Sequence, residues 1–417
     1  MMQKIEYKNI GETVYEGILD NGLRIKVIPK PGFSSFYAVY GTNYGGAMRN
    51  FEVDGEKTHT PAGVAHFLEH KMFDLPNGDN ALEMLSSNGA DPNAFTSSGV
   101  TCYYFKCTSL FEENLRLLLH FVSTPYFTAE TVEKEQGIIG QEIQMVQDNP
   151  GSRIYYGLLK LLYDHHPIRD EVAGSIESIA EITDKTLYDC HKVFYAPSNM
   201  CLCVEGDVDP DRIFEIANEE LPKEKRAIPH ADYGDEESLF PCEKKNVLQM
   251  PVSAPQFLIG SKVEGRSFKD RLVAALSVRL LLGPSSPFYT RLYADGTLNR
   301  DFDAEVDYSA GTATCIIGGE SQNYQKVYDE LVSEVKGLDI PDDYFERTKK
   351  SAIGGRLRMM EDFEEVCVST LFGVFEGYNF FDTMEEFEKI TKKDCMCWIK
   401  NNLSEEKLAM SVIEPVK

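Results

Sequence analysis

Alternating apolar and polar residues open the chain and predict a β-sheet at its start. Asn21-Gly22 separates two alternating runs that begin at residue 14, which predicts a β-hairpin, and a further strand follows up to about residue 48. Helical periodicity then appears at residues 61–73, 79–88, 108–124, 128–148 and 151–163, with strand-like sequence around residues 93–107. A strand at residues 199–207 and a helix from Asp209 complete this first half.

A charged, proline-containing segment without apolar periodicity predicts a linker at residues 223–245, between domains at residues 1–222 and 246–417. The second domain repeats the order of the first. Strands are expected near residues 246–262 and 301–319, helices at 268–294 and through 324–401, and a final strand at KLAMSVIEP. Both domains are therefore predicted to be α+β, each a mainly antiparallel sheet with helices packed on one face, which is consistent with an ancient duplication.

The charge and the cysteines exclude several classes of protein. With 67 acidic against 42 basic residues the net charge is −25, which argues against a nucleic-acid partner. It favours basic peptides as ligands, unless the charge serves only to keep the protein soluble. The ten cysteines form no C-x-x-C pair, so buried reduced thiols are expected. Without a signal-like start or an 18-residue apolar run, the expected location is cytoplasmic and no membrane partner is predicted.

The segment AGVAHFLEHKMF carries the first candidate chemistry. Thr60 and Pro61 fit a helix N-cap followed by proline at the first helical position. His66 and His70 then lie one turn apart on one face, with Glu69 beside them, so both imidazoles can bind one metal ion while the carboxylate reaches a water molecule. This H-x-x-E-H order is the inverted zinc-peptidase motif. Two core histidines bonded to backbone carbonyls are the alternative.

A third metal ligand is expected on the helix at residues 128–148. Glu135 and Glu142 are two turns apart on its apolar stripe, where carboxylates are costly unless they are paired or bind a metal. Glu142 is therefore the candidate ligand and Glu135 its supporting carboxylate, although salt bridges across a helix interface would also explain them. The stripe is predicted to comprise Ile138, Ile139, Ile143 and Val146.

Three blocks of sequence resemble the pitrilysin or insulinase family of zinc peptidases (M16), in the branch that includes the mitochondrial processing peptidase and compact bacterial members. The blocks are GVAHFLEHKMF at residues 63–73, NGADPNAFTSSGVTCYY at 88–104 and EKEQGIIGQEIQMVQDNP at 133–150. The resemblance implies one zinc ion per chain, held by His66, His70 and Glu142. It also implies that Glu69 is the general base and Glu135 an accessory acid of a zinc metalloendopeptidase.

The same resemblance implies a clam-shell of two domains that pairs with an identical or related chain and encloses unfolded peptides. Asn93 matches the position that contacts the substrate backbone when a peptide adds a strand to the sheet edge. The C-terminal half departs from the family pattern, because Tyr293 stands where arginine is expected and Arg300 where tyrosine is expected. Either the two side chains exchange roles, or a partner chain completes the site, or this C-terminal half has lost the function. The alternative to a peptidase is a non-catalytic or partner-dependent subunit of a peptidase-like heterodimer.

Overall fold

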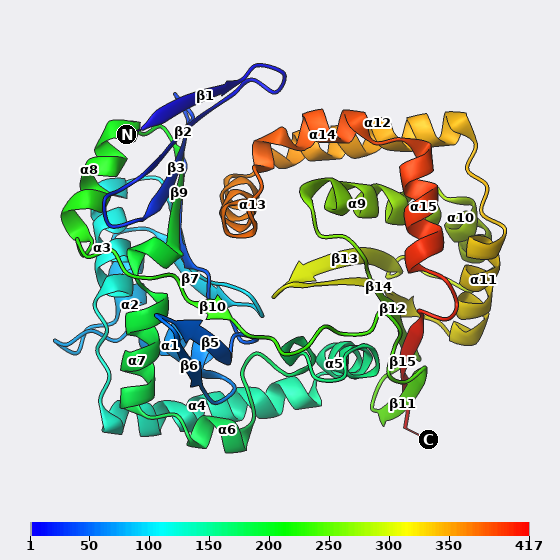
Figure 1. Cartoon of the computed structure of the whole chain (residues 1–417), viewed down its shortest axis with the longest axis horizontal. Coiled ribbons are helices and arrows are strands. Elements are labelled where there is room, and N and C mark those ends of the chain that lie inside the picture. The colour runs from blue at the N-terminus through cyan, green and yellow to red at the C-terminus, as the bar shows by residue number, and fades with distance from the viewer. Residues whose placement is uncertain (1, 417) are drawn as a thin grey trace. The chain divides into compact units, whose positions relative to one another are not determined.

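The computed structural model describes residues 2–416 and divides them into two compact units that are not continuous in sequence (Figure 1). Of these residues, unit 1 comprises those up to 143 together with 171–233 and 357–381, and unit 2 comprises 144–170, 234–356 and those from 382 onwards. Residues 144–170 of the predicted domain at 1–222 thus belong to unit 2, and residues 357–381 of the predicted domain at 246–417 belong to unit 1. Each of these two segments carries a helix, α5 (Pro150–Leu162) and α13 (Phe363–Glu376).

Unit 1 is built on a sheet with the strand order β1-β2-β3-β9-β4-β8-β7. The predicted hairpin is confirmed, since β2 and β3 pair antiparallel around a turn in which Gly22 has a φ of 91°, a conformation that glycine adopts without strain. All neighbours are antiparallel except β3 and β9. The strands are β1 (Gln3–Tyr7), β2 (Glu12–Ile18), β3 (Arg24–Pro29), β4 (Phe36–Thr42), β7 (Asp91–Thr96), β8 (Thr101–Cys107) and β9 (Met200–Gly206).

Side-chain alternation along these strands gives the sheet two apolar faces. On β4, Ala38 and Tyr40 join the larger core, whereas Tyr37 and Val39 point to the opposite face. The larger core is shared with α1 (Val64–Lys71), α2 (Ala81–Ser87), α3 (Phe111–Ser123), α4 (Ala129–Asp148), α7 (Asp184–Phe194) and α8 (Pro210–Glu220). The opposite face is covered by α13, which the chain supplies more than 150 residues after β9.

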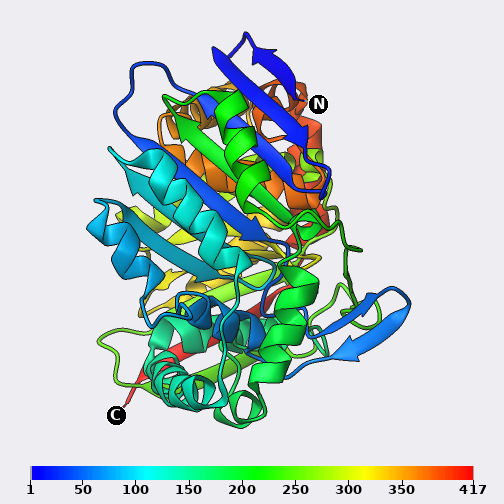
Figure 2. The same ribbon diagram turned by 90° about the vertical axis from the view of Figure 1, so that its left-hand side faces the viewer.

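A hairpin that the sequence did not predict stands outside the main sheet. Strands β5 (Asn50–Val53) and β6 (Glu56–His59) pair with the short β10 (His230–Ala231) in a separate sheet, and Figure 2 shows the hairpin extending from the unit. Helices α6 (Ile176–Ala180) and α7 were also not predicted, although Ser175 and Thr183 form capping boxes at their starts. The hairpin is polar and exposed along β6, so it lacks the alternation that identifies a half-buried strand.

Unit 2 repeats the topology of unit 1. Its strand order is β11-β15-β12-β14-β13, with only β11 and β15 parallel, so it matches the order β3-β9-β4-β8-β7 strand for strand. This confirms the α+β class and the two similar domains. The strands are β11 (Lys245–Met250), β12 (Gln256–Lys262), β13 (Asp303–Ser309), β14 (Thr312–Glu320) and β15 (Ala409–Pro415).

The two faces of this second sheet are covered by helices from different parts of the chain. One face packs on a core shared by α9 (Phe268–Leu282), α10 (Pro287–Ala294), α11 (Tyr324–Lys336), α12 (Asp342–Met359), α14 (Thr383–Lys389) and α15 (Lys392–Asn402). The other packs on α5, so in both units the second face is covered by the exchanged helix. The stretch at residues 268–294 is long and apolar enough to cross a membrane, but 61% of an 18-residue window within it is buried, as in a core helix.

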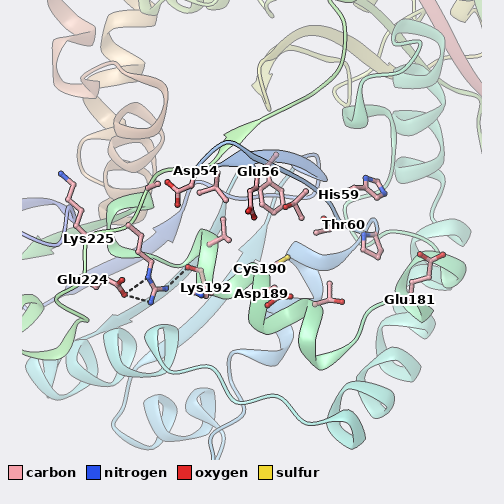
Figure 3. A pocket seen from close by; sticks show the side chains of 18 residues that line it. Asp54, Glu56, His59, Thr60, Glu181, Asp189, Cys190, Lys192, Glu224 and Lys225 are labelled. Carbon is pink, nitrogen blue, oxygen red and sulfur yellow. Dashed lines mark hydrogen bonds and ion pairs between the residues drawn. The ribbon is translucent and has the colours of Figure 1, made fainter.

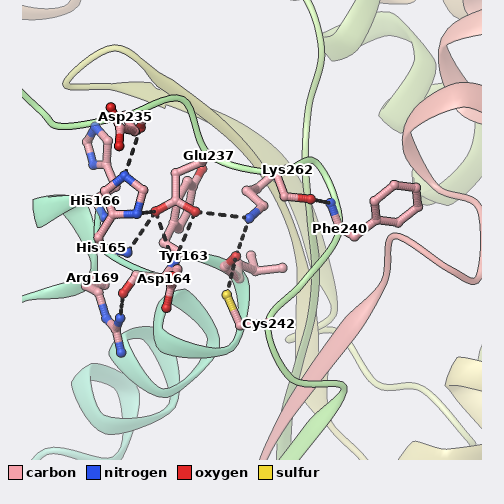
Figure 4. Close-up of polar contacts among 12 residues, drawn as sticks. Tyr163, Asp164, His165, His166, Arg169, Asp235, Glu237, Phe240, Cys242 and Lys262 are labelled. Carbon is pink, nitrogen blue, oxygen red and sulfur yellow. Dashed lines mark hydrogen bonds and ion pairs between the residues drawn. The ribbon is translucent and has the colours of Figure 1, made fainter.

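A network of polar contacts fastens the segment after residue 233 to the end of α5 (Figure 4). The carboxylate of Glu237, only 10% exposed, accepts hydrogen bonds from the backbone N–H groups of residues 164, 165 and 166 at 2.9–3.1 Å. The ammonium of Lys262 lies 3.5 Å away. Burial alone would raise the pKa of Glu237, but these donors and the lysine outweigh it and lower the pKa to about 2.

We expect Glu237→Gln to lower the free energy of unfolding by about 2–3 kcal/mol at pH 7, because an amide nitrogen would then face buried N–H donors. Since folding lowers the pKa of Glu237, its stabilisation is present above the ordinary carboxyl value of 4.5 and is lost as the pH falls towards about 2. Urea unfolding between pH 7 and 3 checks this, with the exposed neighbour Glu236→Gln as control. Equal stability of the two variants at pH 7 contradicts it.

Candidate metal centre

The metal-motif helix α1 begins later than the sequence predicts. Its N-cap is Gly63, with a φ of 96° and no side-chain cap, and the first helical residue is Val64, so the prediction of a cap at Thr60 is wrong. Instead, the backbone N–H and the side-chain hydroxyl of Thr60 both donate hydrogen bonds to the carbonyl oxygen of Arg49. A Cβ on Gly63 would lie 2.6 Å from the carbonyl oxygen of Ala173, so close packing and a left-handed φ both require glycine there.

Helix α1 still places the two histidines on one face, and α4 brings a carboxylate to them. His66 Nε2 lies 3.5 Å from Glu142 Oε1, and His70 Nε2 lies 3.5 Å from Glu142 Oε2. The potential ligand atoms of these three residues all lie within 4.8 Å of one another. The hydrogen bond from His66, together with the positive charge that either histidine can carry, holds the pKa of Glu142 below its usual range.

Glu142 reaches the histidines because α4 packs one side on the core of unit 1. Val132, Ile139 and Ile143 are the buried residues of this helix. The predicted stripe is therefore partly wrong, since Ile138 is 46% exposed and Val146 is only half-buried. Glu135 and Glu142 lie at the edge of the buried stripe, and Ile138 is turned still further from it, towards solvent.

Glu135 binds the outer nitrogen of His70. His70 Nδ1 lies 3.0 Å from Glu135 Oε1, and because an ionised carboxylate only accepts, Nδ1 carries a hydrogen. In the neutral ring the lone pair is then on Nε2, the nitrogen that faces Glu142. Burial would lower the pKa of His70, but Glu135, Glu142 and Glu69 outweigh burial and raise it. Such a carboxylate–histidine pair fixes the tautomer that binds a metal.

The residues fit a zinc ion by their chemistry. Two imidazole nitrogens and one carboxylate oxygen are the ligand set of a catalytic zinc, which keeps its fourth position open. Within residues 2–416, no lysine or arginine forms an ion pair with Glu135 or Glu142, and the side chains that contact both carboxylates are histidines. In the same range His66 Nδ1 is buried without a hydrogen-bond partner, which leaves Nε2 as the nitrogen that contacts Glu142.

Glu69 lies half-buried on α1 next to His70, and a residue that the sequence did not single out binds it. The hydroxyl of Thr96, at the end of β7, donates to Glu69 Oε2 at 2.5 Å. Only its place in the block NAFTSS at residues 93–98 could have drawn attention to Thr96. Glu69 thus belongs to the same cluster as the three potential metal ligands and Glu135.

The residues predicted to bind substrate lie in two places. Asn93 is exposed on β7, the edge strand of the first sheet, and its side chain accepts a hydrogen bond from the N–H of Ala94. Tyr293 and Arg300 belong to unit 2. Tyr293 is 43% exposed on α10 and stacks on Tyr289 with ring centroids 5.5 Å apart, and Arg300 is exposed between α10 and β13.

A separate cavity of about 860 Å³ lies in unit 1 between α7, the hairpin of β5 and β6, and residues 224–227 (Figure 3). None of the potential metal ligands lines it. Its polar lining mixes carboxylates with lysines and an arginine, and burial raises the pKa of its Cys190 thiol to about 12. The thiol of Cys190 is therefore not a reactive nucleophile near neutral pH.

Two protein-family models match most of the chain. Residues 56–175 match the family described as Insulinase (Peptidase family M16), and residues 181–352 match the Peptidase M16 inactive domain. The chain is 36% identical, over the full length of both proteins, to the uncharacterized zinc protease YmfH of Bacillus subtilis. An uncharacterized zinc protease of Mycobacterium leprae is 26% identical over 73% of this chain and 71% of its own.

Solved structures share the fold over nearly the whole chain. A putative M16-like peptidase from Alicyclobacillus acidocaldarius superposes with a TM-score of 0.92 at 30% identity, covering 97% of this chain and 99% of its own. A protease from Helicobacter pylori, at 19% identity, gives a TM-score of 0.82 over 96% of this chain and 99% of its own and supports the fold alone.

Proposed function

Because the chain belongs to the insulinase family of peptidases (M16), we propose that it is a zinc-dependent endopeptidase that uses Glu69 as its general base. The observation that carries the proposal is the gathering of His66, His70 and Glu142 within 4.8 Å, with Glu69 and Glu135 beside them. These side chains come from the short helix α1 and the long helix α4. A purely structural role gives no reason to bring three carboxylates to two histidines without a lysine or arginine.

In this proposal His66, His70 and Glu142 hold one zinc ion. When bound, zinc supplies Lewis acidity, which makes water more acidic and polarises a peptide carbonyl. Glu69 takes the proton from the attacking water and delivers it to the leaving amine. Glu135 holds His70 in the tautomer that leaves Nε2 free. Asn93 on the exposed edge of β7 binds the peptide backbone as an added strand.

The substrates, partners and location follow from the same proposal. We infer that unfolded peptides, with a preference for basic ones, are cleaved in a chamber formed with a second, identical or related chain in the cytoplasm. The net charge of −25 supports the attraction of basic peptides. In this scheme Tyr293 and Arg300 serve the roles that arginine and tyrosine serve in the family.

A non-catalytic or partner-dependent subunit is the second candidate. It is favoured by the reversed order of Tyr293 and Arg300 and by the match of residues 181–352 to a domain described as inactive. The presence of three potential metal ligands, a candidate base and a supporting carboxylate in one cluster favours the peptidase. A subunit that only shapes a chamber has no use for a base beside a metal site.

The test is to incubate the zinc-loaded chain alone with unstructured peptides of about 15–40 residues, acidic and basic, with and without a chelator. We expect chelator-sensitive internal cleavage, faster for the basic peptides, read by mass spectrometry. Zinc binding without cleavage, by the chain alone, supports the partner-dependent subunit. Absence of both contradicts the proposed function.

A further inference from the structure

The carboxylate of Glu69 is held by one strand of the sheet. Helix α1 packs against β7, and the hydroxyl of Thr96, the last residue of that strand, donates to Glu69 Oε2 at 2.5 Å. Within the described part of the chain, no protein group bonds the other oxygen, Oε1, and no lysine or arginine pairs with Glu69. One oxygen is therefore anchored by a neutral donor, while the other is left for a reacting molecule.

Thr96 is itself fixed by the sheet. It pairs with Thr101 on β8 in the last register position of the two strands, and their hydroxyl oxygens lie 3.2 Å apart. Thr101 is fully buried and donates to the carbonyl of Tyr44 at 3.0 Å. On its other side Thr101 pairs with Thr42 of β4, so three threonines lie in a row across three strands. Because β-branched side chains have few rotamers, this row gives the Thr96 hydroxyl a defined position.

The kind of donor matters for the chemistry of Glu69. An arginine or lysine at this distance would orient the carboxylate but would also neutralise it and weaken it as a base. A threonine hydroxyl orients it without adding a charge. Glutamate has three rotatable side-chain bonds, so a free Glu69 would spend much of its time away from a productive position. Misplacement of a catalytic group by about 1 Å can cost about 100-fold in rate.

Thr96 also lies three residues after Asn93 on the same strand. The edge strand that would receive the peptide backbone is therefore the strand that holds the base. A peptide bound along β7 and a carboxylate bound to Thr96 would both be held by the same strand, which fixes the distance between them better than two separate loops would.

We propose that Thr96 is the positioning residue of the general base: its hydroxyl holds Glu69 Oε2 and so aims Oε1 at the attacking water, while the strand pairing of Thr96 with Thr101 keeps Thr96 in place. The kinetic part of this proposal rests on the proposed peptidase function. The structural part, that Thr96 fixes the orientation of Glu69, does not depend on activity.

The kinetic test compares Thr96→Val, which removes the hydroxyl at nearly constant shape, with Thr96→Ser, which keeps it. We expect the valine variant to lose about 10–100-fold in kcat with KM, zinc content and melting temperature unchanged, and the serine variant to stay within about threefold of wild type. Ser98→Ala, two residues after Thr96 in the loop that follows β7, is the control, since no hydrogen bond of its hydroxyl is seen among the described residues. A valine variant with normal kcat, or a serine variant as slow as valine, overturns the proposal.

Crystal structures of the zinc-loaded wild type and the two variants supply a readout that does not need activity. We expect one position of the Glu69 carboxylate in the wild type and in Thr96→Ser, and several in Thr96→Val. An unchanged Glu69 in the valine variant overturns the positioning role even if the protein is an active peptidase. If the wild type cleaves nothing, the proposed function fails, while these structures still decide whether Thr96 positions Glu69.

Discussion

Glu69→Gln is expected to lower the rate of peptide cleavage by about 10²–10⁴-fold while the protein keeps its zinc. The amide has nearly the shape of the carboxylate and can still accept a hydrogen bond from Thr96, so the fold and the metal ligands remain in place. It cannot take a proton from water, so the base is lost. The measurement is kcat on one peptide, combined with metal analysis of the same sample.

The control for this prediction is Glu133→Gln, an exposed glutamate on the α4 helix that also carries Glu142. It removes the same charge from the same region and should leave cleavage unchanged. Normal turnover by the Glu69→Gln protein would sink the assignment of the base. Loss of zinc from that protein would show instead that Glu69 supports the metal site.

Glu142→Gln is expected to remove the metal altogether, and His66→Ala to do the same. Glu142 contacts both histidines, so without its charge two neutral nitrogens are left to hold a divalent cation. Zinc at 100 times its dissociation constant should stabilise the wild type by about 2.7 kcal/mol and leave Glu142→Gln unaffected. Thermal melting with and without zinc, together with metal analysis, measures the difference.

Glu135→Gln gives an intermediate result in the same experiment. It removes the partner of His70 Nδ1 but none of the three potential ligands, so zinc affinity should fall by about 10–100-fold without being lost. The graded order, wild type above Glu135→Gln above Glu142→Gln, separates a ligand from its supporting carboxylate. If Glu142→Gln binds zinc as tightly as the wild type, Glu142 is not a ligand.

Part of the candidate site was predictable because the signals for it lie within single helices. The four-residue spacing of His66 and His70 on one helix fixes their common face, and this was visible before any fold was known. Glu142 could be selected because a carboxylate at the edge of an apolar helix stripe demands a partner. The contact of Thr96 with Glu69 joins residues 27 apart on different elements, and no periodicity records it.

The helix boundary at α1 shows how tertiary contacts override local signals. Thr60 and Pro61 have the composition of a helix start, but Thr60 is held by the carbonyl of Arg49. The helix therefore begins after Gly63, where the backbone passes too close to Ala173 for a side chain. Capping preferences are worth about 1 kcal/mol, so they yield to such contacts.

The sequence by itself determined the α+β class, the order of most strands and helices, and the face of α1 that carries the histidines, because these depend on periodicities within single elements. Only the tertiary structure decided that α5 and α13 each cover the sheet of the other half, and that β7 holds Glu69. The spacing of apolar residues in the sequence shows that one face of a helix must be buried. Which sheet buries it depends on packing between residues that are far apart along the chain.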